Sequence, residues 1–156
     1  TRILTAMRWK LVISILMAVA VGIVIGAYLF KDTRPRSFLT VPHCTSSCLS
    51  TSEFIGLLTS IGIQKIPTAI SIVKETDKVI VVKSPVPLAR VDFLILPKKD
   101  IRDLGDLSAD DGVYIDETFL VISELIRENN LKDYKVISNG PGYQTTNYLH
   151  FHLLAE

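Results

Sequence analysis

The feature that most constrains this chain is a run of 20 uncharged residues near its start. Residues 11–30 read LVISILMAVAVGIVIGAYLF, and the most polar side chain in the run is that of Ser14. An α-helix of this length is about 30 Å long, which matches the hydrocarbon core of a bilayer, and it satisfies its own backbone hydrogen bonds in lipid. We therefore predict a single membrane-spanning helix over residues 11–30, preceded by a tail over residues 1–10.

Two other interpretations of this run compete with a membrane span. A buried core helix is rarely this long and this free of polar residues. A cleaved signal peptide is the stronger rival, because Arg8-Trp9-Lys10 resembles a charged n-region and Ala18-Val19-Ala20 resembles a cleavage site. The segment is part of the chain, so we expect it to be retained as the anchor of a single-pass membrane protein.

The charges beside the predicted span do not decide its orientation. Three basic residues precede the span and three follow it within a few positions, so the positive-inside comparison is a tie. The residues compared are Arg2, Arg8, Lys10, Lys31, Arg34 and Arg36. The side of the membrane on which the rest of the chain lies is therefore left open.

Small residues recur every four positions within the predicted span. Ala18, Gly22 and Gly26 would form one stripe along a helix, and such stripes let a second helix approach closely. The stripe predicts contact with an integral-membrane partner. Ordinary transmembrane composition is the alternative, because glycine is common in such helices.

The overall composition excludes one class of partner and locates the apolar material. The chain has 17 basic and 16 acidic residues, so no whole-protein field attracts nucleic acid, and we expect no nucleic-acid binding. Hydrophobic residues make up 48% of the 156 residues, which is enough for one packed domain plus an appendage. The mean hydropathy of +0.35 is high for a soluble protein, and the excess sits at the N-terminal end.

Beyond the span, the pattern predicts a linker and then one folded domain. Pro35 and Pro42 break helical structure, so residues 31–49 are predicted to be a linker. The domain is predicted over residues 50–156. It begins with a short helix that ends near Ser60, since the sequence before it has capping-box spacing.

The domain is predicted to be α+β, with a mainly antiparallel five-stranded sheet and one long helix. The helix is the only long segment with apolar residues at helical spacing, whereas the strands are short β-type runs. The predicted strands are Ala69–Val73, Val79–Val82, Val91–Leu96, Tyr134–Asn139 and Tyr148–Leu154, and the predicted helix is Ser108–Asn129.

The last predicted strand carries the residues with the most chemical potential. Side chains alternate between the two faces of a strand, so Tyr148, His150 and His152 are expected on one face and the intervening apolar residues on the other. Two imidazoles side by side form a cluster that suits phosphate binding or nucleophilic attack. A solvated strand face is the alternative interpretation of the same pattern.

The domain resembles the histidine-triad (HIT) superfamily, nearest its nucleoside-phosphoramidate hydrolase branch. The family pattern is His-φ-His-φ-His-φ-φ, where φ is apolar, and this chain has Tyr148-φ-His150-φ-His152-φ-φ. Further matches occur in the same order along the chain. They are Ile66-Pro67, the hairpin residues 73–79, Phe93–Lys99 (FLILPKK), Ser138-Asn139-Gly140 and Gln144-Thr145.

The resemblance implies a function and a role for each matching residue. The implied function is a nucleotide or phosphate-ester hydrolase or transferase that uses no cofactor and no metal, and it is compatible with a homodimer through this domain. His150 matches the nucleophile that attacks the α-phosphorus, and His152 matches a phosphate-binding histidine. The remaining phosphate-binding positions are Asn139, Gln144, Thr145 and Tyr148.

Four departures from the family pattern bear on activity. The first histidine is Tyr148, whose phenol does not titrate near neutrality. The stretch Lys83-Ser84 lacks the acid that holds the ribose, Tyr143 replaces a glycine, and Asp100 replaces a histidine. These changes support an alternative function, a non-catalytic accessory subunit of an integral-membrane complex that uses the HIT fold as a scaffold.

Two cysteines in the linker leave three alternatives open. Cys44 and Cys48 are spaced C-x3-C next to His43, which resembles half of a metal site, but zinc needs about four ligands. A disulfide would form in an oxidising compartment. Two free thiols are the third alternative.

Overall fold

The computed structural model describes residues 2–34, 51–65 and 71–156. The chain divides into two compact units, Thr1–Asp32 and Thr33–Glu156. The cysteines Cys44 and Cys48, the neighbouring His43 and the Ile66-Pro67 motif lie outside the described residues.

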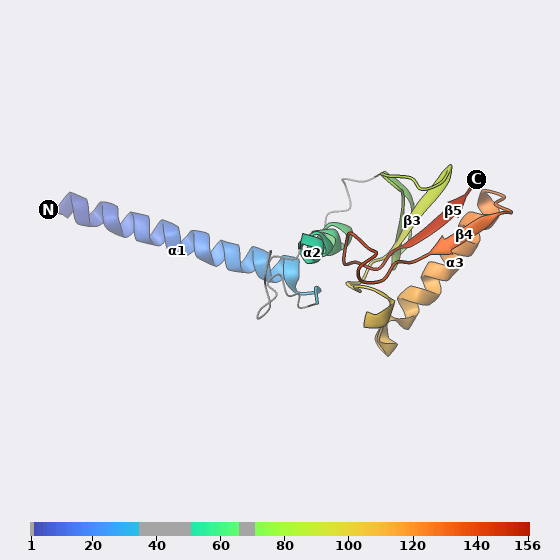
Figure 1. Cartoon of the computed structure of the whole chain (residues 1–156). Coiled ribbons are helices and arrows are strands. Elements are labelled where there is room, and N and C mark those ends of the chain that lie inside the picture. The colour runs from blue at the N-terminus through green and yellow to red at the C-terminus, as the bar shows by residue number, and fades with distance from the viewer. Residues whose placement is uncertain (1, 35–50, 66–70) are drawn as a thin grey trace. The chain divides into compact units, whose positions relative to one another are not determined.

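The first unit is the helix α1 (Arg2–Phe30), drawn in blue in Figure 1. The helix predicted over residues 11–30 is present, and it extends nine residues further toward the N-terminus than predicted. The part Trp9–Phe30 is long and apolar enough to cross a membrane, by length and composition. A signal sequence passes the same test, so this observation fits both interpretations.

The second unit contains a five-stranded antiparallel sheet in the order β1-β2-β3-β5-β4. The strands are β1 (Ile72–Glu75), β2 (Val79–Lys83), β3 (Val91–Pro97), β4 (Tyr134–Ile137) and β5 (Phe151–Ala155). The predicted pairing of the last two strands is confirmed, since Tyr134 lies opposite Ala155 and Ile137 opposite His152. The α+β fold with an antiparallel five-stranded sheet is therefore confirmed.

The first hairpin differs from the prediction in where its turn lies. Strand β1 extends two residues beyond Val73, the predicted end of this strand, and so includes Lys74 and Glu75. The actual turn is shorter because Thr76 closes it: the Thr76 amide donates to the Val79 carbonyl at 2.9 Å, and the Thr76 hydroxyl accepts from the Val79 amide at 3.0 Å. Lys74 is accommodated in the strand although it is charged. Its ammonium group forms ion pairs with Glu124 and Glu128 of the long helix.

The helix α2 (Thr51–Lys65) is longer than the sequence predicted. The prediction ended it near Ser60, but the helix continues for a further turn. Ile61 and Ile63 in this extension are buried, and Ile63 packs against Ile80 and Val82 of β2. Tertiary packing on the sheet thus extends the helix beyond the segment with an obvious capping signal.

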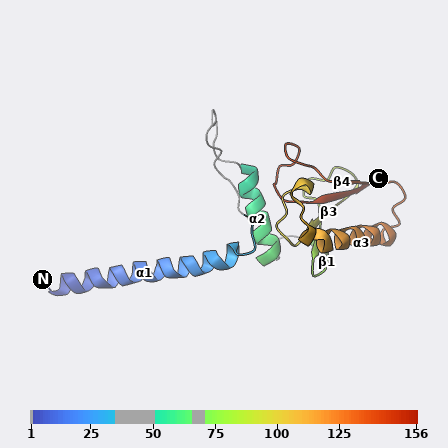
Figure 2. The same ribbon diagram turned by 90° about the horizontal axis from the view of Figure 1, so that it is seen from below.

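The predicted long helix is confirmed as α3 (Gly112–Glu128), which covers one face of the sheet (Figures 1 and 2). Two short 3-10 turns, η2 (Leu104–Asp106) and η3 (Ala109–Asp111), precede it. Burial of each large apolar side chain in this interface contributes about 1.5–3 kcal/mol. The core side chains are Val121, Ile122 and Leu125 of α3 against Val79, Val81, Phe93, Ile95, Phe151 and Leu153 of the sheet.

The opposite face of the sheet is the one that presents histidine. Phe151 and Leu153 pack toward α3, so His152 between them projects from the other face. Part of that other face is covered by a second apolar cluster, in which Ile63 of α2 contacts the sheet and Tyr148. The sheet therefore has a packed face under α3 and a second face shared by α2 and the histidines.

Candidate functional site

Two imidazoles lie together at the start of β5, as the sequence predicts. The rings of His150 and His152 are 5.4 Å apart between centroids and meet at 68°. The strand itself begins at Phe151, three residues later than predicted, so His150 lies just before the regular strand. His152 lies opposite Leu94 of β3 in the register.

A backbone carbonyl sets the tautomer of His150. The ring atom Nδ1 lies 2.7 Å from the carbonyl oxygen of Tyr148. A carbonyl oxygen only accepts, so Nδ1 carries the proton and donates it. In the neutral ring, Nε2 then holds the free lone pair, which is the state that a nucleophilic imidazole requires.

The surroundings of His150 favour this neutral state. Burial lowers the pKa of the His150 imidazole below its ordinary value of 6.5. The hydrogen bond to the Tyr148 carbonyl works to raise that pKa, and the neighbouring His152 lowers it further. The net direction is downward, so His150 is neutral at pH 7.

His152 is oriented by a carboxylate that the sequence did not single out. Its Nδ1 lies 2.9 Å from Oδ1 of Asp92, whose side chain is fully buried on β3. The other carboxylate oxygen of Asp92 accepts from the Leu88 amide at 2.9 Å. A carboxylate behind a histidine fixes the orientation of the ring. The available signal was an acid within an otherwise apolar strand, a residue type that is rarely buried unless it is paired.

Tyr148 lies on the same sheet face as the histidines, as strand alternation predicts, but it is buried rather than open to the site. It is fully buried in the apolar cluster with Ile63, Ile80 and Val82. Its hydroxyl donates a hydrogen bond to the Pro97 carbonyl oxygen. The phenol is thus committed to the core, and Tyr148 contributes to the site through its carbonyl, which holds His150.

The turn before β5 is tied to the site at two points. The Ser138 hydroxyl donates to the carbonyl of His150 at 3.0 Å. The Gln144 amide nitrogen donates to the Arg102 carbonyl at 3.2 Å and to the Asn147 side chain at 3.3 Å. The other amide atom, Oε1 of Gln144, is buried without a hydrogen-bond partner among the described residues. This oxygen can therefore accept a hydrogen bond from a donor outside the described residues.

Asn139 and Thr145 lie in this turn. Within the described ranges, neither side chain is hydrogen-bonded to His150 or His152. Asn139 is half-buried and Thr145 is exposed. Tyr143, in the same turn, is 88% exposed.

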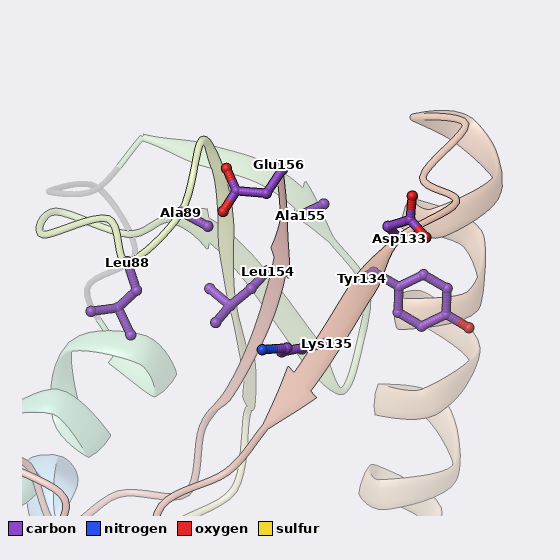
Figure 3. Close-up of a pocket in the computed structure, with 8 residues that line it drawn as sticks. All are labelled: Leu88, Ala89, Asp133, Tyr134, Lys135, Leu154, Ala155 and Glu156. Carbon is purple, nitrogen blue, oxygen red and sulfur yellow. The ribbon is translucent and has the colours of Figure 1, made fainter.

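Neither histidine lines the cavity drawn in Figure 3. This cavity of about 370 Å³ lies at the far ends of β4 and β5, beside the loop that precedes β3. Its lining residues are Leu88, Ala89, Asp133, Tyr134, Lys135, Leu154, Ala155 and Glu156. Among the described residues, no group of three or more histidines, cysteines or acids is arranged to hold a metal ion.

Comparison with known proteins finds one matching family model and several related sequences. Residues 59–156 match the family model described as scavenger mRNA decapping enzyme, C-terminal binding. An uncharacterised HIT-like protein of Chlamydia muridarum is 36% identical over 83 residues, which is 51% of this chain and 66% of that relative. A similar protein of Chlamydia trachomatis is 36% identical over 83 residues, or 51% of this chain and 75% of the relative.

Solved structures show the same fold. A histidine triad protein from Clostridium difficile matches with a TM-score of 0.57 and 25% identity, over 64% of this chain and 89% of that chain. A HIT family hydrolase from Legionella pneumophila matches with a TM-score of 0.56 and 24% identity, over 60% of this chain and 88% of that chain. The shared part is the sheet and helix of the second unit.

Proposed function

This chain belongs to the histidine-triad superfamily, and from that premise we propose a nucleotide or phosphate-ester hydrolase or transferase with His150 as nucleophile. One observation carries the proposal. The Tyr148 carbonyl accepts a hydrogen bond from Nδ1–H of His150, which leaves the lone pair on Nε2, on the sheet face opposite α3. The nearest branch by sequence resemblance acts on nucleoside phosphoramidates, which makes this the substrate class to test first.

The proposed reaction has two displacement steps. Nε2 of His150 attacks the α-phosphorus, a nitrogen–phosphorus bond forms, and the bond to the leaving group breaks. Water, or another acceptor, then attacks the same phosphorus and releases the nucleotide from His150. His152, whose ring Asp92 orients, is the proposed phosphate-binding imidazole beside the nucleophile.

The turn residues complete the proposed phosphate site. Asn139 and Thr145 are the proposed donors to the phosphate or leaving group, and Gln144 is the third proposed phosphate-binding residue of the turn. No acid follows β2, where the hydroxyl of Ser84 is already bonded to the Val86 carbonyl at 3.0 Å. We therefore expect weaker discrimination of the ribose than a carboxylate at this place would give.

Titration calorimetry of the full chain in mild detergent tests the proposed binding. We expect adenosine or guanosine monophosphate to bind, because either places an anionic phosphate beside the two imidazoles. Adenosine 5′-phosphoramidate is then expected to be hydrolysed in a turnover assay. Absence of heat at millimolar nucleotide, with folding checked by circular dichroism, would contradict nucleotide binding.

A non-catalytic accessory subunit is the second candidate function. The observation that favours it is the burial of Tyr148 in the core, since the first triad position supplies no imidazole to the site. Mild-detergent purification from the native membrane separates the two candidates. Stoichiometric co-purification with an integral-membrane complex and no turnover would favour the subunit, whereas a monodisperse protein with turnover would favour the enzyme.

The pH dependence of the first turnover follows from the state of His150. Protonation of Nε2 removes the nucleophilic lone pair, so the rate is expected to fall as pH decreases through the pKa of His150. Because that pKa is lowered, we expect the midpoint of the acid limb below 6.5. Single-turnover rates measured between pH 4.5 and 8 by rapid quench check this, and a midpoint above 6.5 would contradict it.

We propose that α1 anchors this protein as a single membrane span. Support comes from the length and composition of Trp9–Phe30. The protein is expected to stay in the membrane pellet after carbonate extraction. Replacing Met17 and Val21 by arginine is expected to release it, because each central arginine costs about 2.5–3.5 kcal/mol on insertion scales.

The small-residue stripe of Ala18, Gly22 and Gly26 is the proposed contact for an integral-membrane partner. Apart from the adjacent residues and the backbone of α1 itself, no described heavy atom lies within 4 Å of a Cβ built at Gly22 or Gly26, so the stripe has room for another helix. A homodimer through the second unit is a separate proposal. Cross-linking of wild-type protein and of the Gly22→Leu, Gly26→Leu double variant in native membranes distinguishes the two contacts.

A further inference from the structure

Arg34 is bound into the second unit by a dense set of polar contacts. It lies four residues after Phe30, the last residue of α1. Its guanidinium donates to the carboxylate of Asp106 at 2.8 Å and to the Asp106 carbonyl at 2.7 Å. It also donates to both carboxylate oxygens of Asp111, at 2.9 Å and 3.1 Å, and its backbone amide donates to Asp100 at 2.6 Å.

The acids that receive Arg34 are unlike those of an exposed ion pair. The side chain of Asp111 is completely buried, and Asp100 is 1% exposed. Burial works to raise the pKa of the Asp111 carboxyl, but hydrogen bonds from Lys99, Ser108 and Arg34 outweigh it and hold that pKa well below its ordinary value. Asp111 is therefore a buried charged group, and the cations that balance its charge, Arg34 and Lys99, belong to the folded chain.

The same acids hold the segment from Asp100 to Arg102. Oδ2 of Asp106, which accepts from the Arg34 guanidinium, also accepts from the Arg102 amide at 3.3 Å. Oδ2 of Asp100 accepts the Arg34 amide. Arg34 is thus linked to both ends of this segment. Its backbone amide bonds to Asp100, and its side chain bonds to Asp106, which in turn accepts from the Arg102 amide.

The segment in turn holds the turn that carries the proposed nucleophile. The Ile101 carbonyl accepts from the Leu149 amide at 2.6 Å, and the Arg102 carbonyl accepts from the Gln144 side chain at 3.2 Å. Leu149 lies between Tyr148, whose carbonyl fixes the tautomer of His150, and His150 itself. Hydrogen bonds joined by the backbone of residues 100–102 therefore connect Arg34 to Gln144 and Leu149, which lie before and after Tyr148.

We propose that Arg34 is a positioning residue for His150. It acts by fixing residues 100–102, whose carbonyl oxygens hold the turn that orients the imidazole. The inference rests on the proposed function of His150 for its catalytic consequence, but the structural coupling stands apart from it. The residue that follows the apolar helix closely in the chain would then also set the geometry of the site.

The test compares Arg34→Met with a matched control, both in the full chain in mild detergent. Lys74→Met is the control, because Lys74 also pairs with two acids, Glu124 and Glu128, at 2.9 Å and 2.7 Å, in contacts remote from residues 100–102. Three readouts are used. They are hydrogen exchange of residues 144–150 relative to β2, the ¹⁵N shifts of the three histidines, and kcat and KM.

The expected result is specific to the turn. Arg34→Met should raise hydrogen exchange of residues 144–150 by at least about 10-fold relative to β2 and shift the His150 nitrogen signals. A nucleophile displaced by a fraction of an ångström to 1 Å should lower kcat by about 10-fold to 100-fold, with a smaller change in KM. Arg34→Lys should recover part of the lost kcat, since an ammonium group replaces only some of the five N–H donors of the guanidinium.

Two outcomes would overturn the inference. One is unchanged hydrogen exchange at residues 144–150 and unchanged histidine signals in Arg34→Met. The other is an equal change in Lys74→Met, which would show a general loss of stability. If the wild-type protein has no turnover, the proposed function fails, whereas hydrogen exchange and the histidine signals still decide whether Arg34 positions the turn.

Discussion

Replacing His150 by alanine is expected to lower the rate of phosphoramidate hydrolysis by at least about 10³-fold, because the reaction would lose its nucleophile. The loss should fall on kcat, since His152 and the turn would still bind the phosphate. Rapid-quench measurement of the first turnover, with mass spectrometry of the denatured protein, would detect the nucleotide bound to His150 in the wild type and its absence in the variant.

Two controls make this experiment specific. His43→Ala changes the one histidine outside the pair and is expected to leave the rate unchanged. His152→Ala is expected to slow the formation of the covalent adduct without preventing it, because Nε2 of His150 remains available. A folded His150→Ala protein that turns over at the wild-type rate would remove His150 from the mechanism.

The Phe151→Ala substitution is expected to destabilise the second unit by about 3–5 kcal/mol, the usual cost of removing a buried aromatic ring from a core. Phe151 is 4% exposed and packs on the face of β5 opposite the histidines. Its ring meets that of Phe119 edge to face, with centroids 5.6 Å apart. The cavity left by alanine would lie directly under the two imidazoles.

The partner ring supplies the matched control for this substitution. Phe119 is 51% exposed, so Phe119→Ala is expected to cost roughly 1 kcal/mol through the aromatic pair alone. Urea unfolding in mild detergent, followed by near-ultraviolet circular dichroism, measures both variants. Equal costs for Phe119→Ala and Phe151→Ala would contradict the placement of Phe151 in the core.

The elements of the fold that rest on local patterns could be predicted from the sequence. The apolar helix follows from the length of a run without charge, and α3 follows from helical spacing of its apolar residues. Strand β3 ends at Pro97, as its composition indicates. The less accurate boundaries are the ends of β1 and α2 and the starts of α3 and β5, and they depend on side chains that are distant in sequence.

The pairing of His150 and His152 was likewise available from the sequence, since neighbours at i and i+2 share a strand face whatever surrounds them. The roles of Asp92 and Tyr148 were not. Asp92 lies 60 residues before His152, and Tyr148 bonds to a carbonyl 51 residues away. A strand pattern gives the face of a residue but not its partner across the sheet.

The sequence by itself determined the class of the fold, the family resemblance and which imidazoles lie together, because each depends on spacing along one segment. Only the tertiary structure decided what holds those imidazoles. The register of β3 against β5 brings Asp92 to His152, and core packing takes the Tyr148 phenol away from the site. Arg34 reaches acids that are 66 to 77 residues away, because a buried carboxylate such as Asp111 requires a cation that no local pattern identifies.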